Sequence, residues 1–102
     1  MNLNIEHYNL LGKIIKLSYP LFRIENYKLN LNSEENRLYD DLAKNNFITI
    51  YKEDSNYITQ IRNGGMIEFL NFQSNNPGYF EEIKLNDIDF ITDLNNKLKN
   101  QI

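Results

Sequence analysis

The 102-residue sequence contains no cysteine, no tryptophan and no valine, and it has one histidine, one alanine, two prolines and four glycines. Without cysteine the chain can form neither disulfides nor thiolate zinc sites, which fits a reducing, cytoplasmic location. No apolar run approaches the roughly 20 residues of a membrane-spanning helix. The first residues also lack the basic-then-apolar pattern of a signal peptide. With a single histidine, a transition-metal site is not expected, and no motif indicates a cofactor.

The residues that are present predict one folded domain over residues 1–102. Isoleucine, leucine, tyrosine and phenylalanine dominate the hydrophobic 41% of the chain, and their clear periodicity argues against a disordered protein. The net charge of −3 is unevenly distributed, with +2 in residues 1–30, −3 in residues 31–60 and −2 in residues 61–102. The central and C-terminal parts should therefore repel phosphate groups on average.

The clearest pattern lies in residues 33–62. Ser33 is expected to cap a helix, with Asn36 in the reciprocal position of a capping box, and Asn45-Asn46 is expected to end it. Five apolar side chains at helical spacing support this helix: Leu38, Tyr39, Leu42, Ala43 and Phe47. Residues 47–51 and 57–61 are rich in β-branched and aromatic residues, which predicts a hairpin closed by the five polar residues 52–56.

The segments before this stretch are predicted less uniformly. Apolar residues at helical spacing predict a first helix from Ile5 to Leu17, and Pro20 closes it. Residues 21–31 allow either a short helix, favoured near 24–29, or extended pieces.

After the hairpin, Asn63-Gly64 predicts a turn, because both residues accept positive φ. Residues 66–72 are then either a third strand or a short helix. An extended segment at 79–85 and a final helix at 87–100 are expected beyond them. The final helix could cover the core or pair with its copy in a homodimer through its apolar positions Ile88, Ile91, Leu94 and Leu98.

Two parts of the sequence resemble winged-helix proteins. Leu38 to Ile48 is similar to the third helix of that family and its exit into the wing, and Tyr57 to Leu70 is similar to the second wing strand and the apolar residues after it. The resemblance is to small winged-helix proteins of phages and mobile elements. It implies an α+β fold with a winged-helix-like core at about 5–70 and an extension with a C-terminal helix at about 73–102. Because Arg62 and Gly64 depart from the family pattern, another α+β fold, with 66–72 as a third antiparallel strand, stays open.

The charged residues favour a protein partner. If the Ser33 helix is the winged-helix recognition helix, its exposed residues include more acids than bases, and phosphate binding needs lysine and arginine. We therefore expect a small acidic binding protein, a regulator or inhibitor of the phage anti-defence or immunity type, which meets a basic partner through an acidic face. That face comprises Glu34, Glu35, Asp40, Asp41, Glu53 and Asp54.

The alternative is a DNA-binding winged-helix transcription regulator. Asn36 and Arg37 would read the DNA bases, and Lys13, Lys16, Arg23 and Lys28 would contact the DNA backbone. Clustering of these four residues on one side with Arg37 and Lys44 would favour this alternative. Acidic residues around these lysine and arginine side chains would favour the protein partner instead.

No catalytic constellation is recognisable in the sequence. The carboxylate pairs have no nucleophile, base or phosphate loop near them, and Gly64-Gly65 lacks the surroundings of a phosphate loop. His7, beside Glu6 on the first helix, is expected to lie on the surface. The chain is therefore interpreted as a non-enzyme without a metal site.

Overall fold

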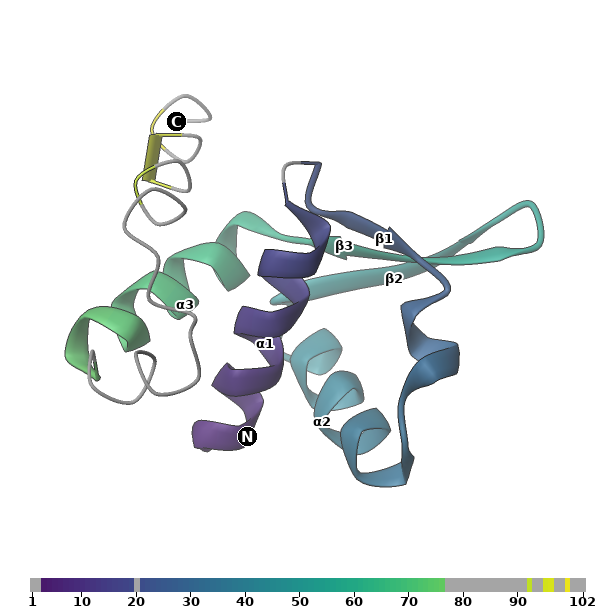
Figure 1. Ribbon diagram of the computed structural model, residues 1–102, viewed down its shortest axis with the longest axis horizontal. Helices are drawn as coiled ribbons and strands as arrows, with labels where there is room; N and C mark the ends of the chain where they lie inside the picture. Colours follow the sequence, from purple (N-terminus) through teal and green to yellow (C-terminus); the bar gives the residue numbers. More distant parts are fainter. Residues whose placement is uncertain (1–2, 20, 77–91, 93–94, 97–98, 100–102) are drawn as a thin grey trace.

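In the part of the chain that the structure describes, the protein is an α+β fold in which three α-helices pack with a three-stranded antiparallel sheet (Figure 1). The computed structural model describes residues 3–19 and 21–76, together with the single residues Thr92, Asn95, Asn96 and Lys99. The elements are α1 (Ile5–Ser18), β1 (Arg23–Glu25), the 3-10 helix η1 (Tyr27–Asn30), α2 (Ser33–Lys44), β2 (Ile48–Glu53), β3 (Asn56–Ile61) and α3 (Asn63–Asn75). The α+β class expected from the sequence is confirmed.

Helix α1 begins after an asparagine cap that the sequence analysis did not identify. The side-chain oxygen of Asn4 accepts hydrogen bonds from the backbone N–H groups of Glu6 and His7, at 2.9 and 3.3 Å. These are the second and third residues of the helix, whose N–H groups are the usual targets of such a cap among the four that a helix start leaves unpaired. The predicted span of 5–17 is confirmed to within one residue. Leu17, however, was expected on the buried face and is 66% exposed.

Helix α2 is capped one residue earlier than expected. The cap is Asn32, whose side-chain oxygen accepts from the backbone N–H of Glu35 at 2.8 Å, while the Glu35 carboxylate accepts from the backbone N–H of Asn32 at 3.2 Å. Ser33 is the first helical residue. The assignment of Ser33 and Asn36 to the capping box was therefore wrong, because Asn32 and Glu35 satisfy the same spacing with a carboxylate in the reciprocal position.

The exit of α2 and the hairpin follow the predicted order. Asn46 has φ 62°, the left-handed conformation that asparagine tolerates, and this confirms the predicted end of the helix. Strands β2 and β3 pair as far as Glu53 and Asn56, so the loop consists of Asp54 and Ser55 alone. The expected five-residue loop was too long, because Lys52 and Glu53 continue the strand.

The third strand comes from the ambiguous segment before α2. Strand β1 pairs antiparallel with β3 from Arg23↔Gln60 to Glu25↔Ile58, which gives the sheet order β1-β3-β2. The short helix favoured at 24–29 is thus replaced by this strand and by η1. Residues 66–72 lie inside α3, so the alternative in which they form a strand was wrong.

Helix α3 starts where a turn was expected. Asn63 and Gly64 are its first residues, and neither has a positive φ. The reason lies in packing at Gly65, where a β-carbon would come within 2.2 Å of the backbone oxygen of Phe47. The helix continues through residues 72 and 73, where the C-terminal extension was expected to begin. The predicted extended segment at 79–85 and the final helix at 87–100 lie outside the described residues, isolated positions excepted.

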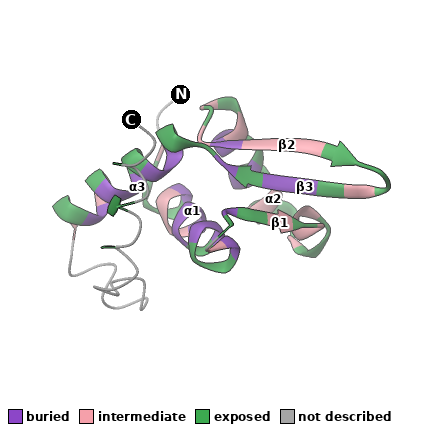
Figure 2. Cartoon of the chain, turned by 90° about the horizontal axis from the view of Figure 1, so that it is seen from above, coloured by how far each residue is buried: buried purple, intermediate pink, exposed green. Residues whose placement is uncertain are grey.

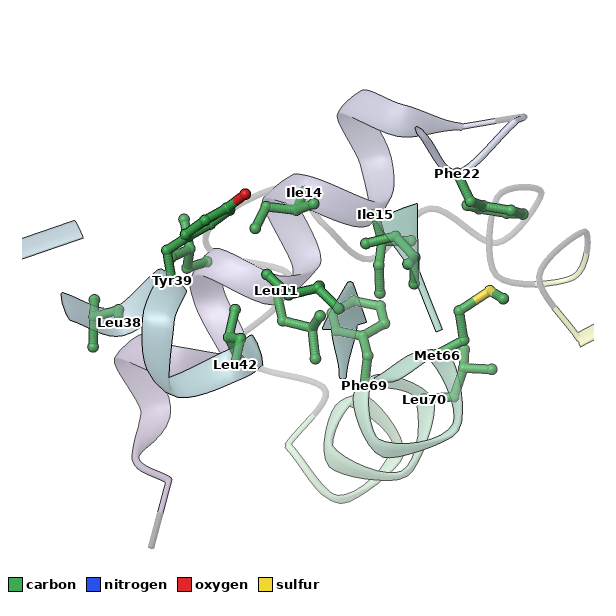
Figure 3. Close-up of a cluster of buried hydrophobic side chains, with 13 residues drawn as sticks. Leu11, Ile14, Ile15, Phe22, Leu38, Tyr39, Leu42, Met66, Phe69 and Leu70 are labelled. Atoms are coloured by element: carbon green, nitrogen blue, oxygen red, sulfur yellow. The ribbon is translucent and has the colours of Figure 1, made fainter. Parts of the chain in front are cut away.

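The core lies between α1, α2, α3 and one face of the sheet. In Figure 2 the buried stretches of α1, α3 and β3 face one another, and the tip of the hairpin is exposed. Figure 3 shows the packed side chains, which include Leu11, Ile14, Ile15, Tyr39, Leu42, Met66 and Phe69. Two contacts tie the layers together. The ring of Tyr8 on α1 stacks on Phe72 of α3, and the hydroxyl of Tyr39 on α2 bonds the hydroxyl of Thr59 on β3.

Candidate functional site

The outer face of α2 carries alternating charges instead of a basic stripe. Glu34, Arg37, Asp40 and Lys44 are exposed on it, since the other side of the helix is buried in the core. Glu35 is half-buried because its carboxylate closes the capping box. Glu34 and Glu35 lie in the first turn of the helix, where their negative charge interacts favourably with the positive end of the helix dipole.

A groove separates the start of α2 from α1. It has a volume of about 200 Å³ and is lined by residues of both helices: Glu6, Asn9, Leu10, Lys13, Asn32, Glu34, Glu35 and Leu38. Three of the lining side chains are carboxylates and one is a lysine. The groove therefore combines an apolar floor, from Leu10 and Leu38, with a predominantly negative rim.

Asp41 does not belong to the exposed acidic face. It is 9% exposed, and its carboxylate lies 2.8 Å from Nε2 of His7, which is itself 3% exposed. The prediction that His7 lies on the surface was also wrong. His7 and Asp41 are 34 residues apart in the chain, and together they join the first turn of α1 to the last turns of α2.

The hydrogen bonds of His7 define its tautomer. The backbone N–H of Asn4 points at Nδ1 from 3.1 Å, so Nδ1 must accept, and the proton of the neutral ring lies on Nε2. Nε2 then donates to Asp41. This hydrogen bond from His7 is the largest influence on the pKa of Asp41 and lowers it, while burial opposes it. The charges of Arg37 and Lys44 lower the pKa further, as does that of His7 when its ring is protonated.

The residues proposed for DNA contact do not form one basic surface. Asn36 is turned toward the backbone before α2, where its amide donates to the carbonyls of Leu31 and Asn32. Lys13 lines the groove among carboxylates, and Lys16 is exposed near the end of α1. Arg37 is 3.8 Å from the Asp41 carboxylate. Asn36 is thus committed to local structure, and Lys13 is surrounded by acids.

The hairpin tip forms a second group of charges, at a distance from the start of α2 (Figure 1). Glu53 pairs with Arg23 at 2.9 Å, Asp54 is exposed at the turn, and Lys52 lies 5.6 Å from the ring centroid of Tyr57. The six acids expected on one face are therefore divided. Glu34, Glu35 and Asp40 lie on α2, Glu53 and Asp54 lie at the hairpin, and Asp41 is buried.

Further expectations bear on metals, membranes and oligomers. Among the described residues, no cluster of three or more histidine and carboxylate side chains is suited to hold a metal ion. Within the same residues, no helix combines the length and hydrophobicity needed to cross a membrane. The positions expected to form a homodimer contact, Ile88, Ile91, Leu94 and Leu98, lie outside the described residues.

Comparisons of the chain with models of known protein families, with curated proteins and with solved structures give no significant match.

Proposed function

We propose that this protein is a non-catalytic binding protein with a winged-helix-like core, and that α2 and the adjoining groove take up a basic segment of a protein partner. In this role it acts as a regulator or inhibitor, as small proteins of phages and mobile elements do in defence and immunity systems. The observation that carries the proposal is the lining of the groove, where Glu6, Glu34 and Glu35 outnumber Lys13.

The order of the elements supports the winged-helix-like part of the proposal. Helix, short strand, short helix, second long helix and hairpin follow one another, and the first strand pairs with the second hairpin strand. Such an arrangement leaves one face of the second long helix exposed for recognition, as in helix-turn-helix proteins generally. Here that helix is α2.

The chemistry of the surface supports a basic partner. A lysine or arginine side chain entering the groove would lay its apolar stem on Leu10 and Leu38 and place its charge among the carboxylates of the rim. Charge complementarity of this kind raises the rate of encounter and selects among partners. Asp40, exposed one turn and a half further along α2, extends the negative surface.

Duplex DNA is the second candidate ligand, because the element order favours it even though the charges do not. Arg37 and Lys44 are exposed on α2, and Lys16 is exposed on α1. A protein that binds DNA through phosphate contacts loses affinity steeply as salt rises. The two candidates therefore predict different responses to ionic strength and to charge reversal.

The first experiment is a titration of fluorescent mixed-sequence duplex DNA with the protein, at about 0.01 M and about 0.15 M salt, followed by anisotropy. The proposal expects no binding at either concentration. Binding at low salt that disappears at physiological salt would replace the protein partner with DNA.

The second experiment compares proteins retained by the immobilised wild-type chain with those retained by two charge-reversed variants. Glu34→Lys reverses the groove rim, and the matched control Glu68→Lys reverses an exposed acid on α3. The proposal expects a partner that is retained by the wild type and the Glu68→Lys variant and lost with Glu34→Lys. Equal retention by both variants would contradict it.

A further inference from the structure

Three side chains connect the start of α1 with the exposed face of α2. The ring of His7 is 4% exposed, and its Nε2 donates to Oδ2 of Asp41. The same Oδ2 lies 3.8 Å from Nη1 of Arg37, whose side chain is 59% exposed. One carboxylate oxygen is thus shared between a buried imidazole and a cation at the surface.

Two groups of Asn4, one a hydrogen-bond donor and one an acceptor, lie close to Nδ1 of His7. The backbone N–H and the side-chain oxygen of Asn4 are each 3.1 Å from Nδ1. When Nδ1 is unprotonated, it accepts from the backbone N–H, as in the capping box of α1. When Nδ1 takes up a proton, it can donate to the side-chain oxygen of Asn4 instead. Both protonation states of the buried ring therefore have hydrogen-bond partners.

The charge on the ring alters what holds Arg37. With neutral His7, Arg37 is the nearer of the cations that compensate the Asp41 carboxylate, Lys44 being the other. With His7 protonated, an imidazolium at 2.8 Å compensates that carboxylate in a buried site, where the attraction is stronger than at the surface. The guanidinium of Arg37 then loses most of the attraction that keeps it near Asp41.

We propose that His7, Asp41 and Arg37 form a proton-sensitive relay, in which protonation of the buried imidazole frees the exposed guanidinium of Arg37 from the Asp41 carboxylate. The proton comes from solvent and binds Nδ1, so the step adds one positive charge and weakens the pairing of the exposed Arg37 guanidinium with Asp41. A basic partner would bind more weakly after release. This consequence alone rests on the proposed function, since the relay itself is a property of the free chain.

The neighbouring charged groups do not replace any member of the relay. On α2, the charge of Lys44 also acts on Asp41, and on α1, Glu6 is exposed beside His7 in the chain. On α3, the carboxylate of Glu68 faces Tyr8 and raises its pKa, after burial as the larger cause. His7 is the only histidine of the chain, and histidine is the side chain whose ordinary pKa lies between about 5 and 8.

The experiment is an NMR titration of the free protein from pH about 5 to about 8. The ring carbons of His7 report its protonation, and the Nε resonance of each arginine reports its surroundings. We expect the Arg37 resonance to shift with the same midpoint as His7. Arg62 is the internal control, because it donates a hydrogen bond to Thr49 of β2 and is not a member of the relay. Its Nε resonance should stay constant. A constant Arg37 resonance through the titration of His7 would overturn the proposal.

The variant His7→Gln provides the second measurement. Glutamine can donate an amide N–H to Asp41 but takes up no proton in this range. The Arg37 resonance should then be independent of pH. A shift of Arg37 that persists in the variant would show that another group controls it and would contradict the relay. If the variant does not fold, the comparison of Arg37 with His7 in the wild type still decides the question, and it does so without any partner.

Discussion

Two neighbouring glycines at the start of α3 should respond in opposite directions to the same substitution. At Gly65 a β-carbon would lie 2.2 Å from the backbone oxygen of Phe47 and 2.9 Å from its carbonyl carbon, inside the 3.0 Å that real β-carbons essentially never cross. That oxygen also accepts a hydrogen bond from the backbone N–H of Arg62 at 3.0 Å. At Gly64 the nearest atom would be the backbone oxygen of Asn46, at an ordinary 3.9 Å.

The expected magnitudes follow from these distances. Gly65→Ala must push α3 away from the β2 end of the hairpin, which costs about 1–3 kcal/mol for overpacking and about 1 kcal/mol for the weakened hydrogen bond. These costs sum to about 2–4 kcal/mol, so the fall in Tm is about 8–32 °C, at about 4–8 °C per kcal/mol in a domain of this size. Glycine loses more backbone entropy than alanine when it enters a helix, and a β-carbon at Gly64 lies at an ordinary contact distance. Gly64→Ala should therefore stabilise the chain by up to about 1 kcal/mol.

The assay is thermal and urea unfolding of the wild type and both variants, followed by circular dichroism. The matched pair controls for composition and position, because the two residues are adjacent and receive the same methyl group. Equal stability of the two variants, or a Gly65→Ala variant at least as stable as the wild type, would refute the close approach of α3 to Phe47.

Three further predictions concern caps, turns and pH. Asn32→Ala should lower the free energy of unfolding by about 1 kcal/mol, and Ser33→Ala should lower it by less than about 0.5 kcal/mol. Urea unfolding measures both, and a larger loss for Ser33→Ala would show that Ser33 is the cap. Asn46→Gly should raise stability by up to about 1 kcal/mol, because glycine adopts the left-handed φ without strain, and a lower Tm would contradict this. Because the pKa of Asp41 is lowered in the folded chain, its stabilisation is complete above the ordinary value of 3.8 and is lost as the pH falls through the lower folded pKa. Asp41→Asn should therefore be less stable than the wild type at pH about 7, and its stability should approach that of the wild type below pH about 4. A difference in urea midpoint that stays the same at both pH values would argue against the pair of Asp41 with His7.

The local elements could be predicted because their signals are short-range. The apolar spacing of α1 and α2 repeats within a few residues, and the alternation of β2 and β3 does the same. The cap of α2 was misplaced by one residue because Asn32 and Ser33 are both good caps, and the choice depends on which one finds a carboxylate three positions later.

The candidate site was only partly predictable, because burial depends on the neighbour of each helix. Asp41 follows Leu38 by three residues, and His7 precedes Leu10 and Leu11 by three and four, so each lies beside an apolar stripe. That spacing could have indicated that both side chains face inward. It could not indicate that they meet, since 34 residues separate them and α1 must first cross α2.

The sequence by itself determined the positions of two long helices and a hairpin, since hydrogen bonds and side-chain periodicity within each segment specify them. Only the tertiary structure decided which segment completes the sheet, because β1 is three residues long and is stabilised by pairing with β3. It also converted Asn63-Gly64-Gly65 from a turn into a helix start, because α3 packs directly on the backbone of Phe47. The packing of α1 against α2 buried one acid of the predicted face, Asp41, beside His7, whereas Glu35 is half-buried and the other four acids are exposed. A charge is buried only where another element supplies its hydrogen-bond partner.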